Sequence, residues 1–171
     1  MIRRIAIFLG IFLSGEVWAH AKLKPGASLK LREDNPGIKT GPCGSMPRGN
    51  NITTLTAGQS LNVEWVETIN HPGSFRIAFS PANDTDFDKN ILATIPDDKD
   101  GTADLPHSFS KTITVPSVVC DNCTIQLIQT MTENPANPSY YYSCADIKII
   151  GTGIEPTVTP LPSASPGQNC D

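Results

Sequence analysis

The sequence predicts an all-β fold, an antiparallel β-sandwich with long N-terminal loops. Three observations predict it. Beyond the first residues no long stretch has helical periodicity, and several short runs alternate apolar with polar side chains. Pro, Gly, Asn and Asp separate these runs, as turns separate the strands of a sandwich.

Five segments carry the strand pattern. In the first of them Leu61, Val63 and Trp65 alternate with Asn62 and Glu64, which is the period of a half-buried strand. The predicted strands are residues 60–69, 74–80, 111–115, 123–131 and 140–150. Short strands in this number favour an immunoglobulin-like or fibronectin-III-like architecture.

The first 19 residues have the pattern of a secretory signal. Two arginines precede an apolar run, and small residues flank position 18 before a cleavage site after Ala19. Cleavage there makes His20 the first residue of the mature protein. A competing site lies after Ala21, and its use would remove the histidine.

The rest of the chain has the size of one domain, which we place at residues 20–150. The formal charge is -4 with both signs interspersed, so a nucleic acid is not an expected partner. No later apolar run reaches the ~20 residues of a spanning helix, so no membrane contact is expected after cleavage. Five cysteines fit an oxidising compartment. We expect a secreted monomer, extracellular or periplasmic.

Two regions lack the strand pattern. Residues 25–51 are rich in Gly and Pro and too long for an ordinary hairpin connection, and loops of this length are often functional. Residues 151–171 combine Pro with Ser and Thr, a composition typical of a linker or a disordered tail.

Histidines are the first candidates for chemistry. A mature N-terminal His20 offers an α-amine and an imidazole, which together chelate copper readily. His71 stands at a Pro-Gly turn before a strand, at the rim of the sandwich, and its alternative is a turn histidine with one backbone hydrogen bond. His107 has no neighbour that completes a site. The carboxylates in loops are interpreted as solvated charges: Asp84, Asp86, Asp97 and Asp98.

Cysteines and tyrosines are the second group. The motif Cys120-Asp121-Asn122-Cys123 could be a redox motif, half of a zinc site or a local disulfide; without a second such motif or a βαβ unit, a structural disulfide is favoured. Cys170 in the tail is left over. In the last strand Tyr140 and Tyr142 share one face and Tyr141 the other.

Four features occur together in order: an N-terminal histidine, His-Pro-Gly before an alternating strand, C-x-x-C before a Gln-rich strand, and a final Tyr-Tyr-Ser-Cys-Ala-Asp-Ile strand. This combination resembles the lytic polysaccharide monooxygenases, in particular a bacterial branch distantly related to the chitin- and cellulose-active enzymes. The resemblance covers about residues 20–150.

The resemblance implies a site. His20, through its amine and one ring nitrogen, and His71 would form a histidine brace for one copper ion. Tyr141, three residues before Cys144, would be the axial aromatic residue. Gln129, or else Gln126, would be the polar residue beside the copper, since alternation lets only one of them face it. The resemblance also pairs the loop cysteine with the last strand, as Cys43–Cys144.

The implied function is copper-dependent oxidative cleavage of glycosidic bonds in an insoluble polysaccharide such as chitin or cellulose. It requires oxygen or hydrogen peroxide and an external electron donor. The sequence departs from the family at Ser139, where an acidic residue or glutamine is usual, and it has no row of exposed aromatic residues. Two other functions compete: a non-catalytic exported copper-binding or copper-delivery protein, and a carbohydrate-binding β-sandwich module.

Overall fold

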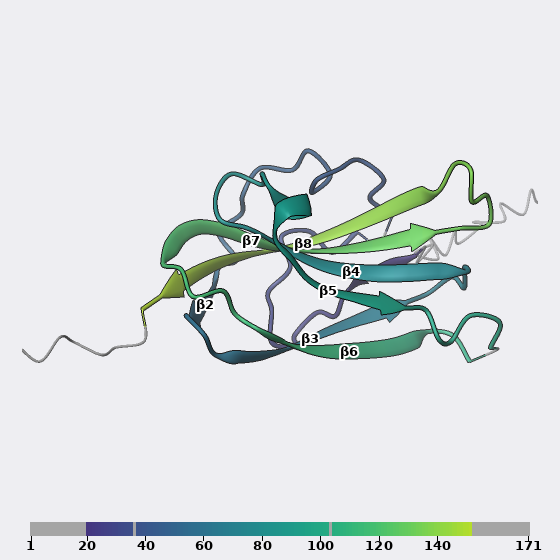
Figure 1. The fold of residues 1–171 in the computed structure, drawn as a ribbon, viewed down its shortest axis with the longest axis horizontal. Helices are drawn as coiled ribbons and strands as arrows, with labels where there is room; N and C mark the ends of the chain where they lie inside the picture. Colours follow the sequence, from purple (N-terminus) through teal and green to yellow (C-terminus); the bar gives the residue numbers. More distant parts are fainter. Residues whose placement is uncertain (1–19, 36, 103, 152–171) are drawn as a thin grey trace, which may run out of the picture.

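The structure is a computed structural model that describes residues 20–35, 37–102 and 104–151. Two β-sheets pack face to face, one of three strands in the order β1-β3-β6 and one of five in the order β2-β8-β7-β4-β5 (Figure 1). The elements are β1 (Ala21–Leu23), β2 (Thr53–Thr56), β3 (Ser60–Glu67), β4 (Gly73–Ser80), the 3-10 helix η1 (Phe87–Lys89), β5 (Ile91–Pro96), β6 (His107–Thr114), β7 (Cys120–Met131) and β8 (Ser139–Ile150).

The predicted all-β sandwich is confirmed, and the five predicted segments correspond to β3, β4, β6, β7 and β8. Three strands were not predicted: β1, β2 and β5. The sandwich is also not wholly antiparallel, because β2 pairs with β8 in parallel. The expected signal, the tail and Cys170 lie outside the described residues. Within the described ranges, no helix is long and apolar enough to cross a membrane.

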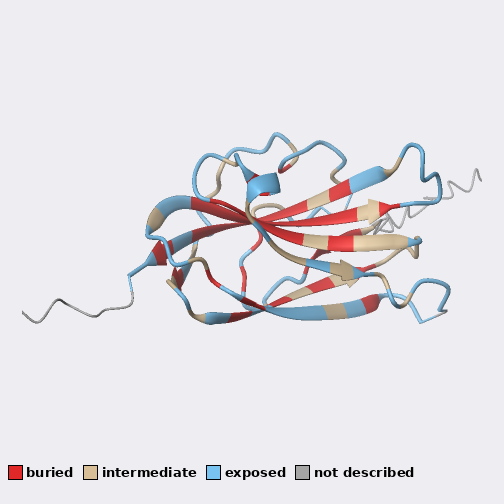
Figure 2. Ribbon diagram, in the orientation of Figure 1, coloured by how far each residue is buried: buried red, intermediate tan, exposed pale blue. Residues whose placement is uncertain are grey.

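The core lies between the two sheets, where buried residues line both inner faces (Figure 2). Leu61, Val63 and Trp65 are buried as their alternation predicts. An aromatic cluster joins the sheets: Trp65 lies 5.4 Å from Phe75 and 5.5 Å from Phe109, centroid to centroid. Such tilted and stacked pairs add to the hydrophobic burial that holds a sandwich together.

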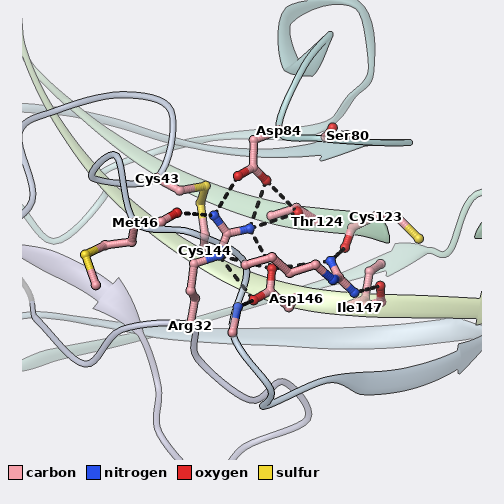
Figure 3. A network of polar contacts seen from close by, with 12 residues as sticks. Arg32, Cys43, Met46, Ser80, Asp84, Cys123, Thr124, Cys144, Asp146 and Ile147 are labelled. Carbon is pink, nitrogen blue, oxygen red and sulfur yellow. Dashed lines mark hydrogen bonds and ion pairs between the residues drawn. A yellow bond between two sulfur atoms is a disulfide. The ribbon is translucent and has the colours of Figure 1, made fainter. Parts of the chain in front are cut away.

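A buried ionic network fastens the long N-terminal loop to the sheet (Figure 3). The side chain of Arg32 is 2% exposed and reaches Asp84 at 2.6 Å and the fully buried Asp146 at 2.5 Å. Asp84 is therefore not the solvated charge expected from the sequence. Burial would raise its pKa, but hydrogen bonds from Arg32 and Thr124 and the charge of Arg32 hold the pKa below its usual value.

Two disulfides complete the framework. Cys43–Cys144 ties the same loop to β8, with 5.7 Å between the Cα atoms. Cys120–Cys123 closes a local loop at the start of β7, where the pairing of β7 with β8 shifts register. The C-x-x-C motif is thus a disulfide in the structure.

Candidate metal centre

The position of His20 follows from the short strand β1, which adds to the edge of the three-stranded sheet. The carbonyl of His20 accepts hydrogen bonds from the backbone N–H and the hydroxyl of Thr68, at 3.2 and 3.1 Å. The next residue, Ala21, pairs with Glu67 of β3. These contacts fix the main chain on the C-terminal side of His20.

Side chains of the five-stranded sheet accept hydrogen bonds from the backbone N–H groups on the free edge of β1. The N–H of Ala21 donates to Oε1 of Gln129 at 2.8 Å, and the N–H of Leu23 donates to Oγ of Ser143 at 3.1 Å. An unpaired edge N–H buried between sheets would otherwise lack a partner. Gln129 and Ser143 therefore hold the N-terminal strand against the five-stranded sheet.

Three aromatic rings from distant parts of the chain meet beside this strand. The ring of Tyr141, on the inner face of β8, stacks on that of His20 with 3.4 Å between centroids and 11° between planes. The ring of His71, from the β3–β4 turn, lies 5.0 Å from His20 in a parallel plane. The structure thus brings together the three residues predicted from the sequence.

Glu133 orients His71. Its carboxylate contacts Nδ1 of His71, and we assign Nδ1–H as the donor, which leaves the lone pair on Nε2. Nε2 of His71 is buried and has no hydrogen-bond partner among the described residues. Partial burial raises the pKa of Glu133, but its own backbone N–H and the two histidines outweigh this and lower it. No sequence pattern indicates Glu133, which lies in the loop between β7 and β8.

Gln129 belongs to a buried polar layer behind the site. Its Nε2 donates to Oε1 of Glu67 at 2.7 Å. Oε2 of Glu67 lies 3.0 Å from Nδ1 of His107, and Nε2 of that histidine lies 2.8 Å from the hydroxyl of Thr102. Burial raises the pKa of Glu67, partly opposed by His107. His107 is 3% exposed, so it is not an incidental surface histidine; its partner lies 40 residues away in the sequence.

Gln126 lies on the opposite face of β7. Its Nε2 donates to the carbonyl of Pro42 at 2.6 Å, and it pairs with Cys144, whereas Gln129 pairs with Tyr141. Strand alternation therefore brings Gln129 and not Gln126 to the histidines. Both polar ends of the Gln129 amide are occupied, by Ala21 and by Glu67.

The donors at this site suit copper. Neutral nitrogen ligands favour copper among the common divalent metals, and a carboxylate on the far ring nitrogen is the usual support of a metal-binding imidazole. The described residues contain no cluster of three or more His, Cys, Asp or Glu side chains that could hold a metal. Among the described residues, the side chains beside β1 supply two imidazoles, those of His20 and His71.

Solved structures similar to this one include polysaccharide monooxygenases. One is the lytic polysaccharide monooxygenase AA15 from Thermobia domestica in the Cu(I) state, with a TM-score of 0.47, 19% identity, and coverage of 67% of this chain and 78% of that one. Another is a cellulose-active polysaccharide monooxygenase from M. thermophila, with a TM-score of 0.47, 14% identity, and coverage of 74% and 64%. No curated protein sequence matches the chain.

A match of the sequence to the model of a protein family identifies the family. The domain described as copper acquisition factor BIM1-like matches residues 19–163, which is most of the chain. The protein therefore belongs to the BIM1-like family, and its association with copper follows from that membership.

Proposed function

We propose that this protein is exported, begins at His20 and binds one copper ion for copper acquisition. The ligands are the amine and Nδ1 of His20 and Nε2 of His71. The observation that carries the proposal is the orientation of His71: Glu133 occupies Nδ1, while the buried Nε2 has no hydrogen-bond partner among the described residues, and the ring lies 5.0 Å from that of His20. Membership of the BIM1-like family supports it.

Cleavage before His20 provides the third nitrogen. In the intact chain His20 has a φ of 82°, a left-handed conformation that costs an L-residue roughly 1–2 kcal/mol. Cleavage removes this torsion and frees the amine. The amine has to lose a proton to bind metal, from a pKa of roughly 7.7–8.0, so copper affinity should rise with pH through that range.

Copper bound at this site would supply a redox-active Lewis acid. The residues around it would determine which molecules reach the metal. Tyr141 covers one face of the His20 ring, and the ammonium of Lys39 lies 5.1 Å from the centroid of Tyr141. Gln129 holds β1 through Ala21 with its oxygen and bonds Glu67 with its nitrogen. We therefore assign Gln129 as a positioning residue and not as a group that contacts oxygen species.

Oxidative cleavage of a polysaccharide is the second candidate function. The stacking of Tyr141 on His20 supports it, because an aromatic ring then lies beside a proposed copper ligand. Its partners would be a polysaccharide surface, an electron donor, and oxygen or peroxide. The occupied amide of Gln129 and the serine at position 139 make acquisition the better supported of the two.

The experiment starts with the mature protein from its own export pathway, whose N-terminus is read by intact mass. Copper titration then compares this protein with His71→Ala and with a matched chain that keeps Ala19 and so lacks only the free amine at His20. We expect 1:1 binding by the mature protein and a large loss of affinity in both others. Equal affinity in all three, or a mature chain that begins at Lys22, would contradict the proposal.

The same samples separate the two functions. Copper-loaded protein is incubated with chitin or cellulose, a reductant and oxygen, and soluble products are analysed by mass spectrometry. Oxidised oligosaccharides that disappear with His71→Ala would establish cleavage. Tight copper binding without such products would support acquisition.

A further inference from the structure

The outer face of the five-stranded sheet carries a cavity of about 630 Å³ that the copper site does not use. β7 and β8 present Gln126, Thr130, Tyr140 and Tyr142 to it, and β4 presents Arg76. Tyr141 lies between the two tyrosines but faces the core. The volume lies within the usual range of small-molecule sites.

The walls of this groove are fixed by covalent and buried contacts. On one side Gly41 lies against the ring of Tyr142, where a Cβ atom would come within 3.0 Å of the ring, and the carbonyl of Pro42 accepts from Gln126. The Cys43–Cys144 disulfide anchors this segment. Asp84, which also lines the groove, is held by Arg32, as Figure 3 shows. The groove is therefore preformed.

The charges that line the groove are already neutralised. Arg76 pairs with Asp88 at 2.7 Å and Asp86 pairs with Lys89 at 2.7 Å. Asp84 pairs with Arg32 at 2.6 Å. An anionic or cationic ligand would have to compete with these pairs for its counter-charge. The groove consequently favours an uncharged ligand.

Two polar atoms of residues that line the groove are buried without a hydrogen-bond partner among the described residues. Oε1 of Gln126, a residue 1% exposed, is an acceptor without a donor among the described residues. Nε of Arg76 is a donor without an acceptor among them. The two residues are diagonal neighbours on adjacent strands, since Gln126 pairs with Ala78, two residues after Arg76.

Hydroxyl groups meet both requirements, because each can donate and accept. A carboxylate or phosphate oxygen cannot donate to Gln126, and an ammonium group cannot accept from Arg76. Tyr140, 40% exposed at the rim, and the half-buried Tyr142 add aromatic faces and hydroxyls of their own. We propose that this groove binds an uncharged saccharide through neighbouring hydroxyl groups. The proposal stands apart from the copper function.

The test uses the intact mature protein without metal. It is titrated with the β-1,4-linked hexaoses of glucose, N-acetylglucosamine, xylose and mannose, and binding is followed by calorimetry and by amide chemical shifts. The test variants are Tyr140→Ala, at an exposed position, and Arg76→Lys, which keeps the charge but lacks Nε. Leu105→Ala is the matched control, because Leu105 is 45% exposed and lies in a different loop.

At least one hexaose should bind and shift residues of β4, β7 and β8. Each test variant should weaken it about fivefold, as loss of one hydrogen bond or ring contact would, while Leu105→Ala stays within about twofold. Co-sedimentation with insoluble cellulose and chitin tells a wall polysaccharide from a free oligosaccharide as the source. Absence of binding at millimolar hexaose, or equal affinity in all variants, would overturn the proposal. Displacement by inorganic phosphate would point to an anion site and overturn it as well.

Discussion

Removal of the Glu133 carboxylate is the sharpest test of the metal centre, because Glu133 contacts the side chain of His71 and not the proposed copper position. Its carboxylate accepts from Nδ1–H of His71 and so keeps the lone pair on the buried Nε2. In Glu133→Ala the ring loses this partner. It can then turn, or adopt the tautomer in which Nε2 carries the proton, and either change opposes metal binding.

The expected loss of copper affinity depends on how far the side chains of Glu133 and His71 are exposed to water. Loss of such a supporting partner usually weakens metal affinity 10–100-fold. The side chain of Glu133 is 45% exposed, so water can replace part of its role, and that of His71 is 21% exposed. We therefore expect about a tenfold loss for Glu133→Ala, equivalent to about 1.4 kcal/mol. Glu133→Gln keeps an acceptor oxygen without the charge and should lose about threefold.

The assay is a copper(II) competition titration on protein that begins at His20, with thermal unfolding as a check on the fold. Glu64→Gln is the matched control, since Glu64 pairs with Lys24 at 3.8 Å on the surface of β3. We expect copper affinity to increase in the order Glu133→Ala, Glu133→Gln, wild type. Wild-type affinity in Glu133→Ala, or an equal loss in Glu64→Gln, would refute the role of Glu133.

Three further predictions follow from the buried contacts. Arg32 stabilises the ionised carboxylate of Asp84 and lowers its pKa, so Asp84 contributes to the free energy of unfolding above its usual pKa of about 3.9, and this contribution disappears as the pH falls through the folded value. Asp84→Asn should therefore reduce the free energy of unfolding by about 1–3 kcal/mol at neutral pH and by less in acid. Urea unfolding of both proteins at several pH values would show this difference. Glu67→Gln places an amide NH₂ against the donors of Gln129 or His107, so thermal unfolding should reveal a loss of about 1–3 kcal/mol, and an unchanged Tm would show that the layer is loosely bonded. Tyr141→Phe keeps the stacking on the histidine and should hold copper within about twofold, whereas a large loss would make the hydroxyl a ligand.

The sequence predicts the long strands well, because their inner faces alternate. Trp65 and Phe75 are fully buried where the period of two places them. β1 was missed because three residues are too few to show a period, although this strand fixes His20. β5 was missed because its Ile91 is exposed and its alternation is weak.

The same limit applies to the site. His20, His71 and Tyr141 could be predicted, since each belongs to a recognisable local pattern. Glu133 and Glu67 could not, because their roles depend on partners 62 and 40 residues away in the sequence, and nothing local distinguishes them from solvated carboxylates. Contacts of this kind arise only once the sheets are packed.

The alternation of β7 and β8 places the two proposed sites on opposite faces of the same strands. Gln129 and Tyr141 face inward, to the N-terminal strand and the histidines, while Gln126 and Tyr140 face the outer groove. A slip of one residue in this pairing would exchange the two faces and leave neither site intact. The Cys43–Cys144 disulfide opposes such a slip, because Cys144 pairs with Gln126 in the ladder while its sulfur is bonded to the loop beside the groove. The bond thereby stabilises the arrangement of both proposed sites, the metal centre, which it does not touch, and the groove, which it borders.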